Sequence, residues 1–362
     1  MAEQKHQENK PQLDWDKARK FLFQVNGDIG AAMLGAMNYI GDKLGIFKAL
    51  ADAGWVTTQE LADRAGLNER YIREWLGAVT SAGYVTYDPA TKKFMLPPEH
   101  AMVLAREESP FFMGGFIEMV IPNVTMAPRI AESFRNGGGV SQSEYPPETW
   151  EAMERSSAGM YRNQLIRKWL PTMPQVVEVL NGGGSAADIG CGSGRAVIAL
   201  ATAFPKAKIF GFDVHPGSIE RARANAKAAG VADRITFEAR DATKLPENQF
   251  DFISTFDVVH DSVDPVALLK SIRRAMKKDA TYLMLEVNVS PNLEENIGPT
   301  GKMMYSISTL YCMTVSLAHG GAGIGACMGE PKARELVAEA GFSKFRRLPI
   351  EDMFSALYEV RS

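Results

Sequence analysis

Hydrophobic and small residues recur at helical spacing over the first fifty residues of the chain. Between positions 14 and 53, Ile29, Met33, Met37 and Ile40 lie three or four residues apart, with alanine and glycine among them. This spacing predicts a helical region with one apolar face. Because that face holds more apolar surface than one helix buries in a small domain, we expect it to pack against a partner.

The pattern changes between positions 54 and 100, where two short amphipathic helices precede a hairpin. Thr57 and Glu60 form a capping box that begins the first helix, and Gly66 ends it. Asn68 caps a second helix, which carries its apolar residues on one face. Two short strands around a turn then occupy 84–96. This order predicts a helix-turn-helix with a wing.

A winged helix is also the fold of many repressors, so DNA binding is a hypothesis to weigh. Opposite charges are almost balanced over 57–100, and the second helix begins with mixed signs instead of a basic face. A structural role for the winged helix is therefore favoured over DNA binding. The five basic and six acidic residues are Arg64, Arg70, Arg73, Lys92 and Lys93, and Glu60, Asp63, Glu69, Glu74, Asp88 and Glu99.

The remaining boundaries follow from composition. Residues 1–13 are polar and are predicted to form a disordered tail. Residues 14–100 are expected to hold the apolar helical region and the winged helix. Residues 101–175 are predicted to be a mostly helical connector, broken by glycines at 137–139 and prolines at 146–147. A C-terminal domain is expected over 176–362.

Short apolar runs alternate with helical patterns through the C-terminal domain. This alternation predicts an α/β domain with a doubly wound, mainly parallel sheet. After a first strand near position 187, the predicted strands are Ile209–Phe212, Ile235–Asp241, Phe250–Val259, Thr281–Asn288 and an antiparallel last strand, Ala356–Arg361.

The first strand leads into a glycine turn at 186–195, which reads Ala-Ala-Asp-Ile-Gly-Cys-Gly-Ser-Gly-Arg. Glycines let the backbone turn sharply and approach a ligand closely. The spacing differs from the dinucleotide fingerprint G-x-G-x-x-G, because Arg195 occupies the position of its third glycine.

Two acidic residues accompany this turn. Asp188 precedes the first glycine by two positions, where a carboxylate would repel a pyrophosphate but orient a cationic amino group. Asp213 ends the next apolar run, where a strand-end carboxylate binds both hydroxyls of an unphosphorylated ribose. The predicted ligand has a ribose and an amino-acid-like cation, and it has no phosphate.

The sequence D-x-G-x-G-x-G followed by G-F-D-V resembles motifs I and II of the class I S-adenosylmethionine-dependent methyltransferases. The resemblance covers residues 176–362. It implies a Rossmann-like sheet of seven strands, S-adenosylmethionine as cofactor, and a homodimer formed through the N-terminal helices. It also implies the cofactor-binding residues Asp188, Gly190, Cys191, Gly192, Gly194, Asp213, Val214, His215, Asp241, Ala242, Phe256 and Asp257.

The fourth predicted strand runs into Val259-His260-Asp261, just before a helix that starts near Pro265. In O-methyltransferases with a similar N-terminal domain, a His-Asp pair at this point supplies the general base. The resemblance therefore makes His260 and Asp261 the candidate catalytic residues, although Ser262 replaces the tryptophan that commonly follows in plant enzymes. A neutral imidazole here would remove a hydroxyl proton. Asp261 would either orient His260 or cap the following helix.

The acceptor stays open at this point. Candidate pocket residues are Tyr145, Tyr161, Glu286, Tyr305 and Tyr311. Transfer to oxygen or sulfur of a small molecule is predicted, with His260 as base. The alternatives are S-methylation of a thiol or thioether by alignment alone, and a winged-helix DNA-binding regulator that senses the cofactor.

Bulk properties narrow the picture further. A length of 362 residues fits two domains, and the net charge of −3 gives no electrostatic footprint for nucleic acid or an anionic membrane. The three cysteines have no metal-ligand spacing and suit a reducing compartment. The polar character of residues 1–10 leads us to expect no secretory signal there. We therefore expect a cytoplasmic protein.

Overall fold

The computed structural model describes residues 13–362, which divide into two structural units, one up to His100 and one from Ala101 onward. The predicted disordered tail falls almost wholly on residues 1–12, which lie outside the described part. Along the described residues, every helix is too short or too polar to cross a bilayer. Helix α5 (Pro98–Leu104) contains the boundary between the units.

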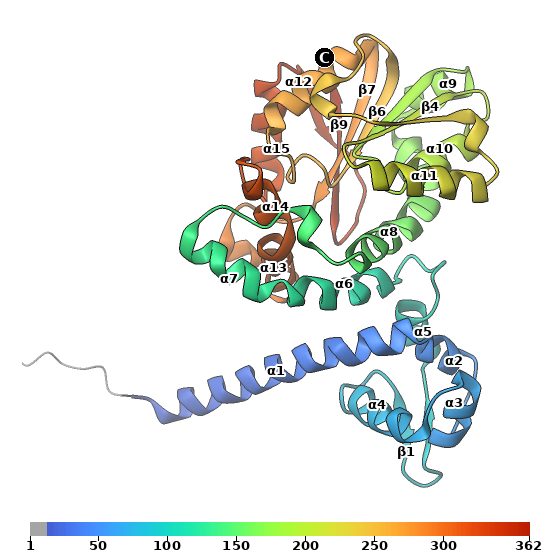
Figure 1. The fold of residues 1–362 in the computed structure, drawn as a ribbon, viewed down its shortest axis with the longest axis vertical. Helices are drawn as coiled ribbons and strands as arrows, with labels where there is room; N and C mark the ends of the chain where they lie inside the picture. The colour runs from blue at the N-terminus through green and yellow to red at the C-terminus, as the bar shows by residue number, and fades with distance from the viewer. Residues whose placement is uncertain (1–12) are drawn as a thin grey trace, which may run out of the picture. The chain divides into compact units, whose positions relative to one another are not determined.

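The first unit is helical with a small hairpin (Figure 1). The helical pattern predicted over 14–53 forms two helices, because Gly45 adopts a left-handed conformation (φ 69°) and separates them. The capping box of Thr57 and Glu60 and the Asn68 cap are both present, as predicted. The elements are α1 (Trp15–Lys43), α2 (Ile46–Ala51), α3 (Thr58–Ala65), α4 (Glu69–Ser81), β1 (Thr86–Asp88) and β2 (Lys93–Met95).

The second unit is built on a seven-stranded sheet, in agreement with the prediction of a Rossmann-like fold. Its strand order is β5-β4-β3-β6-β7-β9-β8. The first five of these are parallel, whereas β9 runs antiparallel to both of its neighbours. The strands are β3 (Ser185–Ile189), β4 (Lys208–Asp213), β5 (Ile235–Ala239), β6 (Phe250–Phe256), β7 (Met276–Val287), β8 (Lys344–Arg347) and β9 (Ser355–Arg361).

Helices cover both faces of this sheet, which is why its central strands are buried along almost their whole length. One core lies between the sheet and α9 (Pro174–Asn181), α10 (Arg195–Ala203) and α11 (Pro216–Ala228). The other lies between the sheet and α12 (Pro265–Ala275) and α15 (Gly329–Glu339). The chain winds outward from β3 in both directions, so the strand order reverses at β3 and β6. A crevice for a ligand forms at such a reversal.

A helical roof gathers at one end of the sheet (Figure 1). It combines the predicted connector with the segment inserted after β7. Two of its members are π-helical, a conformation that occurs often at functional sites. The members are α6 (Gly114–Thr125), α7 (Ala127–Asn136), η1 (Gln142–Glu144), α8 (Glu148–Met160), the π-helix η2 (Tyr161–Trp169), α13 (Pro299–Ile307), the π-helix η7 (Ser308–Cys312) and α14 (Met313–Ala318).

Two strand boundaries differ from the prediction by three residues or more, and one strand was missed. The fourth predicted strand ends at Phe256 instead of Val259, because Asp257 adopts a left-handed conformation (φ 57°) and turns the chain out of the sheet. The fifth begins at Met276, five residues before the predicted start, and β8 was not located from the sequence. The short, charged run of β8 has no alternating apolar pattern, since it is an edge strand.

Candidate active site

The glycine turn after β3 requires glycine at three positions. Gly190, Gly192 and Gly194 all have positive φ angles, of 72°, 50° and 77°. A Cβ on Gly190 would lie 2.6 Å from the side chain of Val258, so the turn packs tightly against the loop after β6. By contrast, nothing lies within 4 Å of the Cβ position of Gly192. The turn therefore faces open space at its centre, where a ligand has room.

The carboxylate of Asp213 joins the ends of the first two strands. Its Oδ2 accepts a hydrogen bond from the Gly192 N–H at 2.9 Å, and its Oδ1 accepts one from the His215 N–H, also at 2.9 Å. Each oxygen keeps a further lone pair, because a carboxylate has about four acceptor sites. The fixed carboxylate can therefore accept from a pair of ligand hydroxyls.

Asp188 is buried within β3, beside its parallel neighbour Ser254 on β6. The Ser254 hydroxyl donates a hydrogen bond to Asp188 Oδ1 at 2.8 Å. Burial raises the pKa of the Asp188 carboxyl to about 7; the hydrogen bond opposes this shift and the charge of Asp213 adds to it. A cation that binds beside Asp188 would favour its ionised form.

Arg195 occupies the position that the third glycine has in a dinucleotide fingerprint. Its guanidinium pairs with an acidic side chain. Its Nε and Nη2 lie 2.8 Å and 2.5 Å from Oε1 of Glu154 on α8. The same oxygen accepts from Asn225 Nδ2 at 2.9 Å. The guanidinium of Arg195, at the end of the glycine turn, is thus paired within the protein, which fits a ligand without phosphate.

The other predicted cofactor residues lie around the same strand ends with different surroundings. Val214 is exposed, whereas Cys191 is buried, and burial raises the pKa of its thiol well above the ordinary value. The ring nitrogen Nε2 of His215 contacts Gln142 Oε1 from the roof. Phe256 packs against Tyr161 with ring centroids 4.8 Å apart and ring planes tilted by 52°.

Asp241 and Ala242 follow β5 at the start of the short helix η5 (Ala242–Lys244). The carboxylate of Asp241 caps this turn by accepting hydrogen bonds from the N–H and hydroxyl of Thr243. Its side chain is therefore committed to its own loop. Asp257, the last predicted member, is exposed at the end of β6.

His260 lies in the loop after β6 and is almost completely buried, with 2% of its surface exposed. The ring therefore lies inside the protein and not on its surface. Its Nδ1 lies 2.5 Å from Glu286 Oε2 at the end of β7, and Glu286 Oε1 accepts from the N–H of Val259 at 3.1 Å. Glu286 thus holds the imidazole from behind instead of lining an open pocket.

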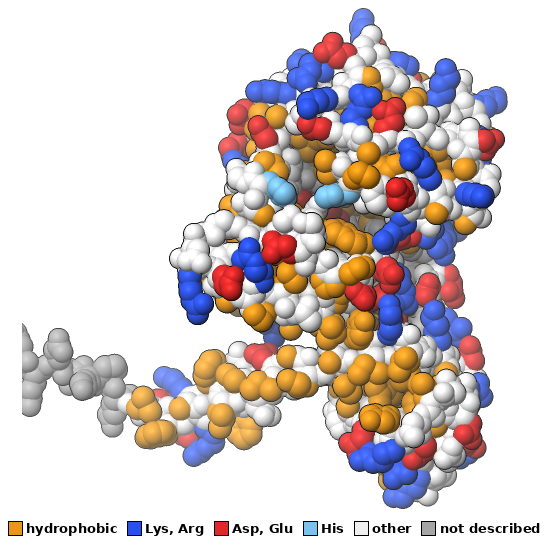
Figure 2. Space-filling view, viewed as in Figure 1, with side chains coloured by type: hydrophobic (Ala, Val, Ile, Leu, Met, Phe, Trp, Pro, Cys, Tyr) orange, Lys and Arg blue, Asp and Glu red, His pale blue; other side chains and the backbone are white. Residues whose placement is uncertain are grey.

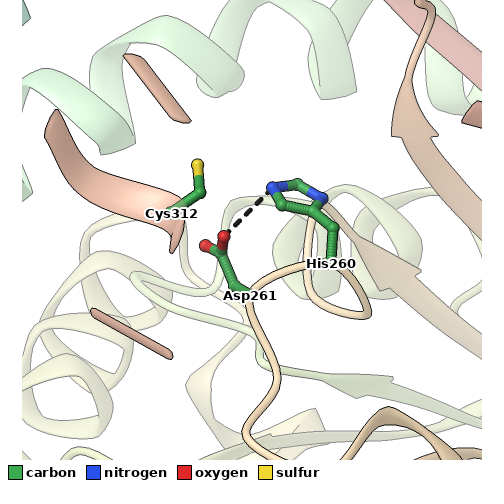
Figure 3. A group of neighbouring side chains, drawn as sticks. All are labelled: His260, Asp261 and Cys312. Atoms are coloured by element: carbon green, nitrogen blue, oxygen red, sulfur yellow. Dashed lines mark ion pairs between the residues drawn. The ribbon is translucent and has the colours of Figure 1, made fainter. Parts of the chain in front are cut away.

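The other ring nitrogen of His260 faces Asp261, whose Oδ1 lies 3.1 Å from Nε2 (Figure 3). Burial alone would lower the pKa of His260, but the charges of Asp261 and Glu286 outweigh it and raise the pKa well above the ordinary value. Asp264, not Asp261, caps helix α12, by accepting from the Ala267 N–H at 2.8 Å. The capping alternative for Asp261 is therefore wrong.

The predicted tyrosines separate into two groups. Tyr145 and Tyr311 are buried and pack edge to face, with centroids 5.1 Å apart, and Trp150 lies 6.5 Å from Tyr311 and 6.3 Å from His215. These rings form an aromatic surface between the ribose side of the site and the roof. Tyr305 instead points its hydroxyl toward Asn296, 3.3 Å away in the inserted segment.

Sequence reasoning missed three residues that organise the site. Gln142 bridges His215 and Tyr311, since its Nε2 donates to the Tyr311 hydroxyl at 3.0 Å. Glu154 and Ser254 support the glycine turn and Asp188, as described above. Of these three residues, only Ser254 could have been found from the sequence. If the first and fourth predicted strands are paired, Ser254 lies beside Asp188.

Two family models match the chain. Residues 180–353 match the methyltransferase domain, and residues 32–106 match the Rv2258c-like winged HTH domain. Among curated proteins, the chain is similar to 27-O-demethylrifamycin SV methyltransferase of Amycolatopsis mediterranei, with 32% identity over 100 residues. These residues are 27% of this chain and 36% of that protein.

A second curated relative is norajmaline N-methyltransferase of Rauvolfia serpentina, which is 25% identical over 46% of this chain and 58% of its own length. The chain thus spans less than two thirds of both relatives.

Two solved structures share the fold along almost the whole chain. The mitomycin 7-O-methyltransferase MmcR has a TM-score of 0.70 at 22% identity, covering 96% of this chain and 99% of that one. Human N-acetylserotonin methyltransferase, solved with S-adenosylmethionine, has a TM-score of 0.62 at 18% identity, covering 98% and 99%. The chain thus carries a methyltransferase domain over residues 180–353, and a winged HTH domain precedes it over residues 32–106.

Proposed function

We propose that this protein transfers a methyl group from S-adenosylmethionine to a hydroxyl oxygen of a small aromatic molecule. The observation that carries this proposal is the buried His260, held at Nδ1 by Glu286 and positioned at the carboxyl end of β6. A histidine oriented in this way is the arrangement expected of a general base.

The residues at the strand ends fit the cofactor. Asp213 offers two fixed carboxylate oxygens for the ribose hydroxyls, and Asp188 offers a buried carboxylate for the ammonium group. The open space at Gly192 leaves room for the methionine portion against the backbone. The guanidinium of Arg195 is already paired with Glu154, in agreement with a phosphate-free ligand.

The cofactor supplies a methyl group already activated on a sulfonium sulfur, so the protein has to align the acceptor, exclude water and accept a proton. Only the neutral imidazole of His260 accepts a proton, and because Asp261 and Glu286 raise the pKa of His260 well above its ordinary value, the base form is favoured at alkaline pH. Asp261 and Glu286 then stabilise the charged imidazolium that results. Their contribution explains why a charged product is tolerated in a buried position.

Aromatic side chains favour a flat acceptor. Tyr145, Trp150 and Tyr311 present ring surfaces in the roof, and aromatic rings prefer edge-to-face or offset contacts with one another. One of the similar structures is by its name a 7-O-methyltransferase, which supports an oxygen acceptor. A thioether acceptor has no proton to lose, so it would leave His260 without a chemical task.

The structure gives no support to the alternative of a DNA-binding regulator. Arg70 on α4 pairs with Glu74 at 2.6 Å, and Arg73 pairs with Glu69 at 2.7 Å. The basic side chains of the second helix are thus neutralised on the helix itself, which weakens any attraction to phosphates.

A homodimer through α1 is the second part of the proposal. Exposed apolar side chains follow one stripe of this helix at Leu22, Val25, Ile29 and Met33. Figure 2 shows hydrophobic side chains along the whole exposed helix. A contiguous apolar stripe of this kind is typical of an interaction surface. A second copy of α1 would cover it with a matching stripe.

Cofactor affinity should depend on pH through Asp188. Below about pH 7 the carboxyl is protonated, so binding an ammonium group must release a proton. We expect the dissociation constant of S-adenosylhomocysteine to rise about tenfold per pH unit below that value. Calorimetry in buffers of different ionisation heat measures both the affinity and the released proton.

Two variants sharpen this test. Asp188→Asn should bind weakly at every pH and release no proton. Ser254→Ala removes the hydrogen bond that lowers the pKa of Asp188, so its transition should move to higher pH. An affinity that stays constant between about pH 6 and 8 in the wild type would contradict the role of Asp188.

The base role is tested by His260→Ala with labelled cofactor and a panel of phenols, thiols and thioethers. We expect a loss of about 10²- to 10⁴-fold in turnover of a phenolic acceptor, with unchanged binding of S-adenosylhomocysteine. Glu286→Gln should lose less, because the base itself remains and the amide oxygen can still accept from the ring, although one of the two charges that stabilise the imidazolium is removed.

Glu294→Gln, an exposed acid in the segment after β7, is the matched control and should keep wild-type turnover. The proposed reaction would be refuted if the wild type methylated only thioethers and if His260→Ala did so at the same rate.

The dimer is tested by Ile29→Asp, which places a charge in the apolar stripe. Burying an unpaired charge is costly, so the dimer dissociation constant should rise by at least about 100-fold in sedimentation measurements. Gln24→Asp adds the same charge on the opposite side of α1 and should leave the dimer intact. A wild-type chain that sediments as a monomer would rule out this assembly.

A further inference from the structure

The ring nitrogen Nε2 of His260, which faces away from Glu286, belongs to a cluster of three residues. His260 Nε2, Asp261 Oδ1 and Cys312 Sγ all lie within 4.8 Å of one another. Figure 3 shows the three side chains converging, with Cys312 coming from a different element than the other two. Nitrogen, oxygen and sulfur donors therefore meet at one point.

The cluster is built by two irregular segments of the chain. His260 and Asp261 lie in the loop that begins where Asp257 turns the chain out of β6. Cys312 is the last residue of the π-helix η7, and it is buried. A π-helix shifts the direction of side chains relative to an α-helix, and such segments occur often at functional sites.

Asp261 carries an unsatisfied oxygen. Its Oδ1 is buried and makes no hydrogen bond within the described part of the chain, although His260 Nε2 lies only 3.1 Å away. Its nearest cationic group is thus the His260 ring, which faces the same oxygen without a well-formed hydrogen bond. This oxygen keeps acceptor capacity toward the centre of the cluster.

Glu286 orients His260 toward the cluster. The bond between Glu286 Oε2 and His260 Nδ1 fixes the ring and leaves Nε2 directed at the cluster. A carboxylate behind a histidine is the usual support of a metal-bound imidazole. A second grouping, Asp257 with His260 and Glu286, shares the same ring. An ion there would have to break the His260–Glu286 contact, so the Nε2 side is favoured.

The mixture of donors selects the kind of ion. Imidazole, carboxylate and thiolate together suit Zn²⁺ or Co²⁺, whereas Mg²⁺ and Ca²⁺ prefer oxygen alone. With bonds of about 2.0–2.3 Å, a tetrahedral ion separates its ligand atoms by roughly 3.2–3.8 Å. From separations of up to 4.8 Å, the donor atoms would therefore have to approach one another by roughly 1.0–1.6 Å at most. Three protein ligands leave one position for water or another small ligand.

From this geometry we infer that His260, Asp261 and Cys312 form a binding site for a zinc ion. Binding displaces the thiol proton of Cys312, and any proton on His260 Nε2, to the solvent, because these donors bind metal in their deprotonated forms. The ion occupies the lone pair that His260 would use to accept a proton. Zinc binding and the proposed base role thus exclude each other at any one moment.

The experiment uses the full-length protein, stripped with a chelator and titrated with Zn²⁺ in a calorimeter without cofactor or acceptor. We expect one ion per chain. Cys312→Ser and Asp261→Asn should each weaken binding by more than about 100-fold, and Glu286→Gln by about 10- to 100-fold. Cys327→Ser, a half-buried cysteine outside the cluster, is the matched control and should bind as the wild type does.

Cobalt substitution gives an independent readout of the ligands. The Co²⁺ protein should show a sulfur-to-metal charge-transfer band that disappears in Cys312→Ser and persists in Cys327→Ser, with thermal unfolding confirming that both variants fold. A failure to bind one ion per chain, or a charge-transfer band that survives in Cys312→Ser, would overturn the assignment. Because no methyl transfer is measured, either result is independent of the proposed reaction.

Discussion

The two hydrogen bonds that Asp213 accepts from backbone N–H groups are the constraint on which the cofactor site depends. One comes from Gly192 in the turn after β3, and the other from His215 after β4. They tie the glycine turn to the neighbouring strand, so the carboxylate and the turn have a fixed geometry before any ligand arrives. A site organised in advance avoids the entropy cost of ordering its loops during binding.

A similar principle operates at the other half of the site. Glu286 on β7 holds both the ring of His260 and the N–H of Val259, so the loop after β6 is anchored to the sheet. The roof reaches the strand ends through Gln142 and Glu154, which contact His215 and Arg195. The sheet therefore provides the rigid positions, whereas the roof provides the aromatic surface that would select an acceptor.

Much of this arrangement could be predicted from the sequence because it follows from local rules. The glycine turn, the strand-end acids and the helix caps of the winged helix depend on short-range chemistry that a pattern reveals. The position of His260 in the chain was predictable too. Its burial was not, because it depends on Glu286 and Cys312, which are distant in sequence.

The errors have the same origin. The capping alternative for Asp261 was wrong because Asp264, three residues later, takes that role. β6 ends earlier than predicted because Asp257 adopts a positive φ angle. Aspartate adopts positive φ more readily than most residues, but it does not require this conformation, so the sequence alone did not reveal the end of the strand. The edge strand β8 lacks the apolar alternation that would have located it.

The most direct measurement of the central claim is a calorimetric titration of S-adenosylhomocysteine into the wild type, Asp213→Ala and Asp241→Ala. Asp241 is an acid at the next strand end whose carboxylate already caps its own turn, so it serves as the comparison. If Asp213 binds the ribose, Asp213→Ala loses two charge-assisted hydrogen bonds to the ligand, and its affinity should be at least about 100-fold weaker than that of the wild type. The affinity of Asp241→Ala should change much less. Equal affinity in the wild type and Asp213→Ala would contradict ribose binding by Asp213.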